Sequence, residues 1–328
     1  MGGLRILLYP FSILYGGVTG LRNWSFDHGW LSQTTFEIPI IAVGNLSTGG
    51  TGKTPMIEFL VRQNEGKRLA VLSRGYGRQT KGYLEVFENS HATDVGDEPL
   101  QFKSKFKESV VVAVCENRVN GVRRLLEEHE LDLILLDDAY QHRYLKASKY
   151  VLLTSYDQPY YNDFLLPAGN LRESRSGADR AQSIVITKCP ADLSEAEKNN
   201  IKNKINPKSP QEIFFSTIFY SMEALGISGK ISLEELKGTK VTVITGIAKP
   251  AYFLDFLKNY VEIDHLQFPD HYNFRSKDIE KLKDKKLVIT TEKDFVRLKE
   301  YELNNLFYIP IEMQFLGESP RFNRSDNW

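Results

Sequence analysis

Residues 44–55, with the sequence GNLSTGGTGKTP, decide the fold, because they have the composition of a phosphate-binding loop. The apolar run 38–43 directly precedes them, and a short strand that enters a glycine-rich turn and then a helix is the context such a loop needs. Glycines let backbone N–H groups converge on phosphate oxygens, and the positive end of the following helix adds to the attraction. The chain is therefore expected to bind a nucleoside triphosphate. The expected phosphate-binding residues are Gly49, Gly50, Thr51, Gly52, Lys53 and Thr54.

Two side chains of this loop carry particular chemistry. Lys53 is expected to reach the β- and γ-phosphates, and the Thr54 hydroxyl to contact Mg²⁺. The loop departs from the pattern G-x-x-x-x-G-K-[ST] at its first position, where Ser47 replaces glycine. The strand before the loop and an acidic motif further along the chain favour a phosphate-binding loop over a plain glycine-rich turn.

The acidic motif is Leu133–Asp138, with the sequence LILLDD. Four apolar residues followed by acid indicate a buried strand with carboxylates at its carboxyl end, where proteins with a phosphate-binding loop hold Mg²⁺. Successive side chains of a strand point to opposite faces, so we expect only one of Asp137 and Asp138 to face the metal. The alternative is a strand that simply stops at a polar turn.

The composition bounds the class of protein. With 328 residues the chain can bury a large core, and we expect two domains. Lysine plus arginine and aspartate plus glutamate each number 42, so the net charge is zero and nothing indicates a nucleic acid partner. The two cysteines, Cys115 and Cys189, lie far apart in sequence, which fits a reducing compartment and gives no metal-type spacing.

The N-terminal segment differs from the rest of the chain, because residues 6–21 carry no charge. Arg5 and Arg22 bound this run and two tryptophans follow it, a pattern that suits a membrane interface. The run is shorter than the roughly 20 residues that a spanning helix needs. We predict a membrane-associated N-terminal helix over residues 1–31 that is not needed for nucleotide binding. A helix packed on the domain is the alternative.

Apolar runs of strand length alternate with helical patterns along the chain. This alternation predicts an α/β fold of the P-loop NTPase type, a mostly parallel sheet with helices on both faces, whose ligands bind at the carboxyl ends of the strands. A second α/β series predicts a smaller C-terminal domain. The expected domains are residues 32–210 and 211–328, and strands near 213–220 and 306–315 are expected to pair as a connector.

Two polar motifs in the first domain are candidates for the ligand site. The stretch SRGYGR places Arg74 and Tyr76 among permissive glycines, where arginine can clamp an anionic group. The stretch GDEP places Asp97 and Glu98 at a turn, where a carboxylate can act as a base or assist Mg²⁺. An ordinary surface turn explains either motif when it is taken alone.

Two more motifs lie further along the chain. The stretch LPAGNLRE contains Arg172 next to an acidic residue, and FPDHY in the second domain contains His271, whose imidazole titrates near neutral pH. A surface loop and a structural histidine are the alternative interpretations.

Together these motifs resemble the tetraacyldisaccharide 4′-kinase family, the lipid A kinases of Gram-negative inner membranes. The resemblance covers most of the chain, although Asn170 stands where the family often has another residue. It implies an enzyme that uses ATP and Mg²⁺ to phosphorylate the 4′-hydroxyl of a glycolipid, tetraacyldisaccharide 1-phosphate. The motifs that carry the resemblance are Gly44–Pro55, Ser73–Arg78, Gly96–Pro99, Asp137–His142, Leu166–Glu173, Phe268–Tyr272 and Thr291–Asp294.

The resemblance also implies roles for individual residues. It makes Asp97 the catalytic base, supported by His271 across an interdomain cleft, and makes Arg118 and Arg172 phosphate-side contacts. Lys53 completes the catalytic set. The candidate metal-site residues are Thr54, Glu98, Asp137 and Asp138. The implied location is the cytoplasmic face of the inner membrane, with the glycolipid and the membrane surface as partners and no obligate protein partner evident.

Three other functions compete with a kinase. A nucleotide-switch ATPase with a second lysine in its loop is disfavoured, because Thr48 occupies the position of that lysine. A GTPase is disfavoured because Pro190 replaces the acid of the guanine-reading motif in the stretch TKCP. A nucleotide-binding module without a lipid acceptor is the third alternative.

Overall fold

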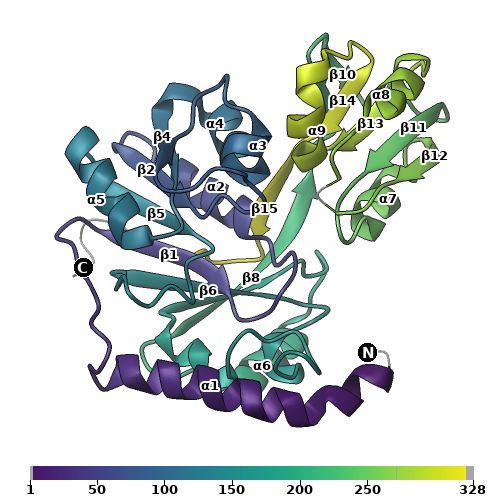
Figure 1. Cartoon of the computed structure of the whole chain (residues 1–328). Coiled ribbons are helices and arrows are strands. Elements are labelled where there is room, and N and C mark those ends of the chain that lie inside the picture. Colours follow the sequence, from purple (N-terminus) through teal and green to yellow (C-terminus); the bar gives the residue numbers. More distant parts are fainter. Residues whose placement is uncertain (1–2, 271, 323–328) are drawn as a thin grey trace.

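The computed structural model describes residues 3–270 and 272–322, which form two β-sheets flanked by helices (Figure 1). The large sheet has nine strands in the order β15-β8-β7-β6-β1-β5-β2-β4-β3, and most neighbouring strands run parallel. Its first eight strands in chain order are β1 (Ile40–Asn45), β2 (Leu69–Ser73), β3 (Leu84–Glu85), β4 (Val110–Val114), β5 (Leu133–Asp137), β6 (Lys149–Ser155), β7 (Ser183–Thr187) and β8 (Glu212–Tyr220). β15 (Ile311–Phe315) completes it.

Helices cover both faces of the large sheet, so its central strands are buried on both sides and are almost wholly apolar. Ile41 and Val43 of β1 pack with α2 (Lys53–Gln63) and α4 (Asp97–Phe106). Ile40 and Ala42, on the other face, pack with α5 (Arg118–Glu128). The predicted doubly covered parallel sheet is therefore confirmed. The short helix α3 (Ala92–Val95) and the helix α6 (Glu195–Ile205) also belong to this part.

The small sheet has six strands in the order β10-β9-β14-β13-β11-β12. Three of its strands, β11 (Lys240–Thr245), β12 (Glu262–Gln267) and β13 (Val288–Thr291), alternate with helices as predicted and pair in parallel. The hairpin β9 (Glu223–Gly226) and β10 (Gly229–Ser232) is an element that the sequence pattern did not predict. The helices of this part are α7 (Ala251–Leu257), α8 (Ser276–Lys283) and α9 (Glu292–Leu298).

Two antiparallel strands connect the sheets. β15 pairs with β8 from Ile311 opposite Tyr220 to Phe315 opposite Ser216, which confirms the predicted pairing for this part of the segment. The predicted connector strand over 306–315 is wrong in its first part, because β14 (Leu306–Ile309) belongs to the small sheet. Pro310 separates β14 from β15, since proline has no N–H with which to continue a ladder. The domain boundary near residue 210 stays a prediction.

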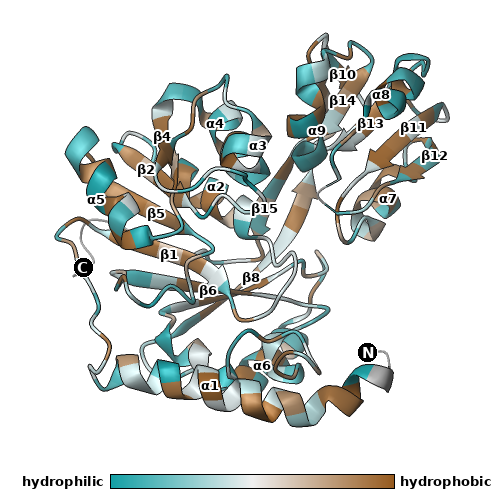
Figure 2. Cartoon of the chain, viewed as in Figure 1, coloured by the Kyte–Doolittle hydropathy of each residue, from teal (hydrophilic) through white to brown (hydrophobic). Residues whose placement is uncertain are grey.

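An N-terminal helix, α1 (Tyr9–Asp27), follows a 3-10 turn over Gly3–Leu8 and lies along the base of the large-sheet part, far from the small sheet (Figure 1). In Figure 2, brown (hydrophobic) residues recur along its ribbon between white and teal ones. An apolar stripe at helical spacing is exposed, and it consists of Leu7, Phe11, Leu14, Val18 and Leu21. Within residues 3–270 and 272–322, no helix is both long enough and apolar enough to cross a membrane.

Candidate functional site

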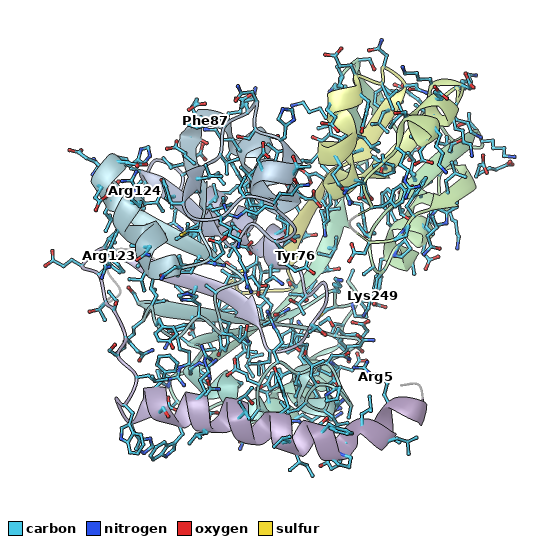
Figure 3. The ribbon with its side chains drawn as sticks, viewed as in Figure 1. Arg5, Tyr76, Phe87, Arg123, Arg124 and Lys249 are labelled. Carbon is cyan, nitrogen blue, oxygen red and sulfur yellow. The ribbon has the colours of Figure 1, made fainter. Side chains whose placement is uncertain are left out.

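A cavity of about 1040 Å³ lies between the carboxyl ends of the large-sheet strands and the small-sheet part. The expected phosphate-binding loop forms its floor, and residues of both parts form its walls. Tyr76 and Lys249, both labelled in Figure 3, lie on the sides of the two parts that face each other. The predicted site residues that line the cavity are Gly49, Gly50, Thr51, Gly52, Lys53, Thr54, Tyr76, Asp97, Glu98, Asp138 and Arg172.

The loop after β1 is held in shape by its own side chains and by β7. The Asn45 amide donates a 2.6 Å hydrogen bond to the Thr51 hydroxyl across the turn. The Thr187 hydroxyl donates to the Thr51 carbonyl at 2.8 Å, which fastens the loop to the end of β7. Gly49 and Gly52 have φ values of 111° and 86°, in the region that favours glycine. The loop is therefore a rigid cradle at the N-terminus of α2.

Asp138 lies between the two cations at the floor of the cavity. Its carboxylate is 3.7 Å from the Lys53 ammonium and accepts a 2.9 Å hydrogen bond from Arg172. Burial alone would raise the pKa of Asp138, but Lys53 and Arg172 outweigh it and hold the pKa below its ordinary value. Asp138 also has a positive φ of 46°, so the turn after β5 directs its side chain into the cavity. The floor of the site thus holds two cations and one ionised carboxylate.

Asp137 lies beneath this floor and does not line the cavity. Only 1% of it is exposed, and Ser73 donates a 2.9 Å hydrogen bond to one of its carboxylate oxygens. Burial, with a further contribution from Glu98, raises the pKa of Asp137 to about 7. Its other carboxylate oxygen has no hydrogen-bond partner within the described residues. Buried Asp137 and cavity-facing Asp138 agree with the expectation that neighbouring acids point to different sides.

The predicted metal-site residues suit a hard divalent cation. Oxygen atoms of carboxylates and hydroxyls are the ligands that Mg²⁺ prefers. Three of the four residues, Thr54, Glu98 and Asp138, line the same cavity, and the unpartnered buried oxygen of Asp137 lies just behind. The residues that are present therefore fit Mg²⁺ beside the phosphate-binding loop.

Arg118 has a place that the sequence did not predict. Only 1% of it is exposed, and its guanidinium donates to the carbonyls of Cys115 at 2.9 Å and Asp137 at 3.0 Å. It therefore does not line the cavity and instead fixes the chain ends of β4 and β5. Arg74 is exposed and also lies outside the cavity lining.

Asp97 begins α4, so the GDEP stretch is a helix start and the expectation of a simple turn is corrected. Gly96, with a φ of 92°, makes the bend that precedes the helix. Arg297 of α9 lies 3.7 Å from the Asp97 carboxylate, and it also pairs with buried Asp294. Asp97 therefore lies where the small-sheet part meets the large-sheet part. His271 lies outside the described residues.

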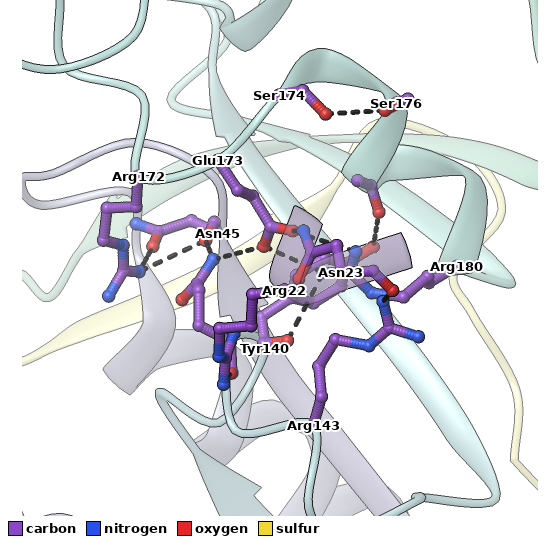
Figure 4. A network of polar contacts seen from close by, with 12 residues as sticks. Arg22, Asn23, Asn45, Tyr140, Arg143, Arg172, Glu173, Ser174, Ser176 and Arg180 are labelled. Atoms are coloured by element: carbon purple, nitrogen blue, oxygen red, sulfur yellow. Dashed lines mark hydrogen bonds and ion pairs between the residues drawn. The ribbon is translucent and has the colours of Figure 1, made fainter. Parts of the chain in front are cut away.

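A second group of polar residues, none of them predicted as a site residue, supports the floor next to Arg172 (Figure 4 labels Glu173 and Arg180). Glu173 is buried and accepts two hydrogen bonds from Arg180, at 2.8 and 2.9 Å, and one from Gln141 at 2.9 Å. Gln141 also donates to the carbonyl of Asn45 at 2.8 Å, just before the loop. Their place within the quoted motifs was the signal available, since Gln141 follows the double aspartate and Glu173 follows Arg172.

A third group links three helices at the side of the cavity, which Glu292 also lines. Lys105 of α4 lies between two carboxylates, 2.7 Å from Glu58 of α2 and 3.0 Å from Glu292 of α9. Burial and the neighbouring Glu292 raise the pKa of Glu58 to about 7, although Lys105 opposes this effect. No sequence signal connects these residues, because they lie on helices from both parts of the chain.

Comparison with known proteins places these features in a family. The sequence profile of the family described as tetraacyldisaccharide-1-P 4′-kinase matches residues 4–325. A tetraacyldisaccharide 4′-kinase of Flavobacterium johnsoniae is 50% identical, over 99% of this chain and 97% of the relative. The corresponding protein of Bacteroides thetaiotaomicron is 41% identical, over 97% of this chain and 91% of the relative.

A solved structure supports the same grouping. The crystal structure of LpxK from Aquifex aeolicus in complex with ATP is similar to this chain, with a TM-score of 0.76 and 30% identity. The match covers 95% of each chain, so it includes both sheets.

Proposed function

The chain belongs to the tetraacyldisaccharide-1-P 4′-kinase family, and from this membership we propose how its cavity and its N-terminal helix perform the reaction. It is a kinase of lipid A biosynthesis that transfers a phosphoryl group to the 4′-hydroxyl of a tetraacyldisaccharide 1-phosphate. Neither a nucleotide switch nor a nucleotide-binding module without an acceptor accounts for similarity over the full length.

ATP binds with its phosphates on the loop of residues 49–54, as the solved relative in complex with ATP supports. Lys53 and Arg172 supply positive charge at the cavity floor, where charge spreads over the transferred group. Thr54, Glu98 and Asp138 are the residues that would hold Mg²⁺, with the buried carboxylate of Asp137 behind them. When bound, the metal neutralises charge on the phosphates.

Asp97 is the group that accepts the proton of the 4′-hydroxyl. It lines the same cavity as Lys53 and belongs to a different element, so an acceptor can lie between the base and the phosphates. Arg297 of the small-sheet part lies 3.7 Å from its carboxylate. We propose a supporting role for His271, which lies outside the described residues.

The observation that carries this proposal is the cluster of Lys53, Asp138 and Arg172 on the floor of a cavity that also contains Asp97. The test is transfer of label from γ-labelled ATP to purified tetraacyldisaccharide 1-phosphate in mixed micelles. Asp97→Asn is expected to lower the transfer rate by at least about 100-fold while ATP binding persists. Asp94→Asn, an exposed acid three residues earlier, is the matched control. Undiminished transfer by Asp97→Asn would contradict the base assignment.

The apolar stripe of α1 docks the enzyme on the cytoplasmic face of the inner membrane. Phe11, Leu14 and Leu7 of this stripe are 62% to 72% exposed. Exposing such large apolar side chains is costly in water, whereas burying them in a lipid surface is favourable. Docking holds the cavity near an acceptor whose acyl chains remain in the bilayer, and so raises its effective concentration.

The membrane proposal is tested with matched apolar substitutions. Leu14→Ser combined with Val18→Ser removes two exposed apolar side chains, and each is worth about 1.5 kcal/mol or more when buried. We expect at least about tenfold weaker binding to vesicles of bacterial phospholipids, with unchanged ATP binding. Phe87→Ser with Leu126→Ser removes exposed apolar side chains elsewhere and is the control (Figure 3 labels Phe87). Equal vesicle binding by both double variants would place the anchor elsewhere.

A further inference from the structure

The inner face of α1 follows one loop of the catalytic part along its length. The Ser12 hydroxyl donates to the Leu165 carbonyl at 2.9 Å and accepts from the Ala168 N–H at 3.0 Å. One turn later, the Tyr15 hydroxyl donates to the Arg172 carbonyl at 2.8 Å. These contacts face away from the apolar stripe, so the two sides of the helix have different partners.

The other side of this loop contacts the phosphate-binding loop. The Arg172 N–H donates to the Leu46 carbonyl at 2.7 Å, and the Thr48 N–H donates to the Asn170 carbonyl at 2.8 Å. A β-bridge between Ser47 and Leu171 lies between these two hydrogen bonds. The segment 170–173 is therefore held between α1 and the start of the phosphate-binding loop.

Asn23, two turns further along α1, contacts the polar group of Figure 4. Its amide donates a 2.7 Å hydrogen bond to the Glu173 carboxylate. Glu173 is buried, with only 3% of it exposed. Gln141 joins Glu173 to the Asn45 carbonyl, and Asn45 in turn holds Thr51. A continuous series of hydrogen bonds thus runs from α1 to the phosphate cradle.

We propose that Tyr15 and Asn23 are positioning residues of the nucleotide site, because they fix the 170–173 segment that carries Arg172 against the phosphate-binding loop. The inference rests on the proposed phosphate contact of Arg172. It departs from the expectation that the N-terminal helix is not needed for nucleotide binding. One helix then serves both as the membrane anchor, through its stripe, and as a wall of the catalytic scaffold.

The physical reason is that the side chain of Arg172 can contact the phosphates only when the 170–173 segment is held against the phosphate-binding loop. A segment fixed on one side alone samples more conformations, and ordering it on binding costs affinity. One hydrogen bond of the kind that Tyr15 makes contributes about 1 kcal/mol, which corresponds to about fivefold in affinity. A hydrogen bond to a buried carboxylate, as Asn23 makes, contributes more.

The test measures binding of a fluorescent ATP analogue with Mg²⁺ in the absence of lipid. Tyr15→Phe is expected to weaken binding about fivefold. Asn23→Asp places a second carboxylate against Glu173 and is expected to weaken it at least about tenfold. The matched controls are Tyr9→Phe, on the same helix, and Asn203→Asp, an exposed asparagine of α6. Melting temperature and the KM values for ATP and for the lipid are measured in parallel.

A positioning role predicts a raised KM for ATP with little change in the KM for the lipid and in melting temperature. ATP binding by both variants that equals binding by their controls would overturn the inference. A fall in melting temperature that accounts for the whole loss of binding would overturn it as well. Arg172→Ala separates this result from failure of the proposed function. Normal ATP binding by Arg172→Ala would refute the proposed phosphate contact of Arg172. Weakened ATP binding by Arg172→Ala, but not by the Tyr15 and Asn23 variants, would refute the positioning role of α1.

Discussion

Replacing Glu58 with glutamine is expected to stabilise the protein above pH 7, even though it removes a buried ion pair. Glu58 is 1% exposed on the helix that follows the phosphate-binding loop. The charged groups around it are Lys105 at 2.7 Å, Arg62 at 3.6 Å and Glu292, which shares Lys105. Burial and the repulsion of Glu292 exceed the attraction of the cations, so the pKa of Glu58 rises from its ordinary value of 4.5 to about 7.

The size of the effect on the free energy of unfolding follows from this rise in the pKa of Glu58. Between pH 4.5 and about 7 the folded protein keeps a proton on Glu58 that the unfolded chain releases. The contribution of Glu58 to stability is complete below pH 4.5 and is lost as the pH rises through 7. Each pH unit of this window is worth about 1.4 kcal/mol, so the loss approaches about 3 kcal/mol at pH 8. Glutamine keeps the shape and the acceptor oxygen of the protonated acid without the cost of ionisation.

The assay is urea unfolding of the wild type and of Glu58→Gln at several pH values from 5 to 8. The two proteins should have similar free energies of unfolding at pH 5, and the variant should become more stable by up to about 3 kcal/mol at pH 8. Glu65→Gln, an exposed acid just beyond the same helix, should show no such divergence. A Glu58→Gln variant less stable than the wild type at pH 8 would refute the reasoning, since the ion pair with Lys105 would then outweigh the cost of burial.

Three further predictions concern the chemistry. Lys53→Ala should lower turnover by about 100-fold or more, with Lys67→Ala as the control. Near-normal turnover by Lys53→Ala would show that Lys53 does not contact the phosphates. Asp97→Ala and His271→Ala should each slow the chemical step in single-turnover assays while ATP binding survives, and the double variant should lose less than the product of the two, because groups that act together are not additive. Removing Mg²⁺ with a chelator should weaken ATP binding at least about tenfold, as measured by titration calorimetry. ATP that binds equally well without metal would contradict the metal site.

The parts of the site that the sequence predicted are those encoded by neighbouring residues. The phosphate-binding loop follows an apolar strand, and the carboxylates of Asp137 and Asp138 follow another. Both strands end at the same edge of a parallel sheet, so the loops that follow them lie side by side. The strand pattern alone was therefore enough to predict that these loops meet. The strand alternation likewise predicted the large sheet, since each of its central strands is an unbroken apolar run.

The parts that the sequence did not predict depend on contacts between distant segments. The sequence allowed Arg118 to lie at the phosphates or behind them. Only the folded sheet, in which β2 separates β4 from β5, shows that its guanidinium binds carbonyls at the ends of both strands. The triad of Glu58, Lys105 and Glu292 requires three helices from both parts to meet. The proline at position 310 is visible in the sequence. That it divides the 306–315 segment between two sheets depends on which sheet each half joins.

The charges of the cavity floor give a physical reason to expect nucleotide and metal to bind together in the proposed site. Lys53 and Arg172 already share Asp138, and Glu98 lines the same cavity. A triphosphate that draws these two cations away leaves the carboxylate of Asp138 without its partners, in a place where burial already disfavours its charge. A divalent cation would restore that balance, because carboxylates and phosphate oxygens are both its preferred ligands. We therefore expect nucleotide and divalent cation to bind more tightly together than either does alone, as phosphoryl transfer requires.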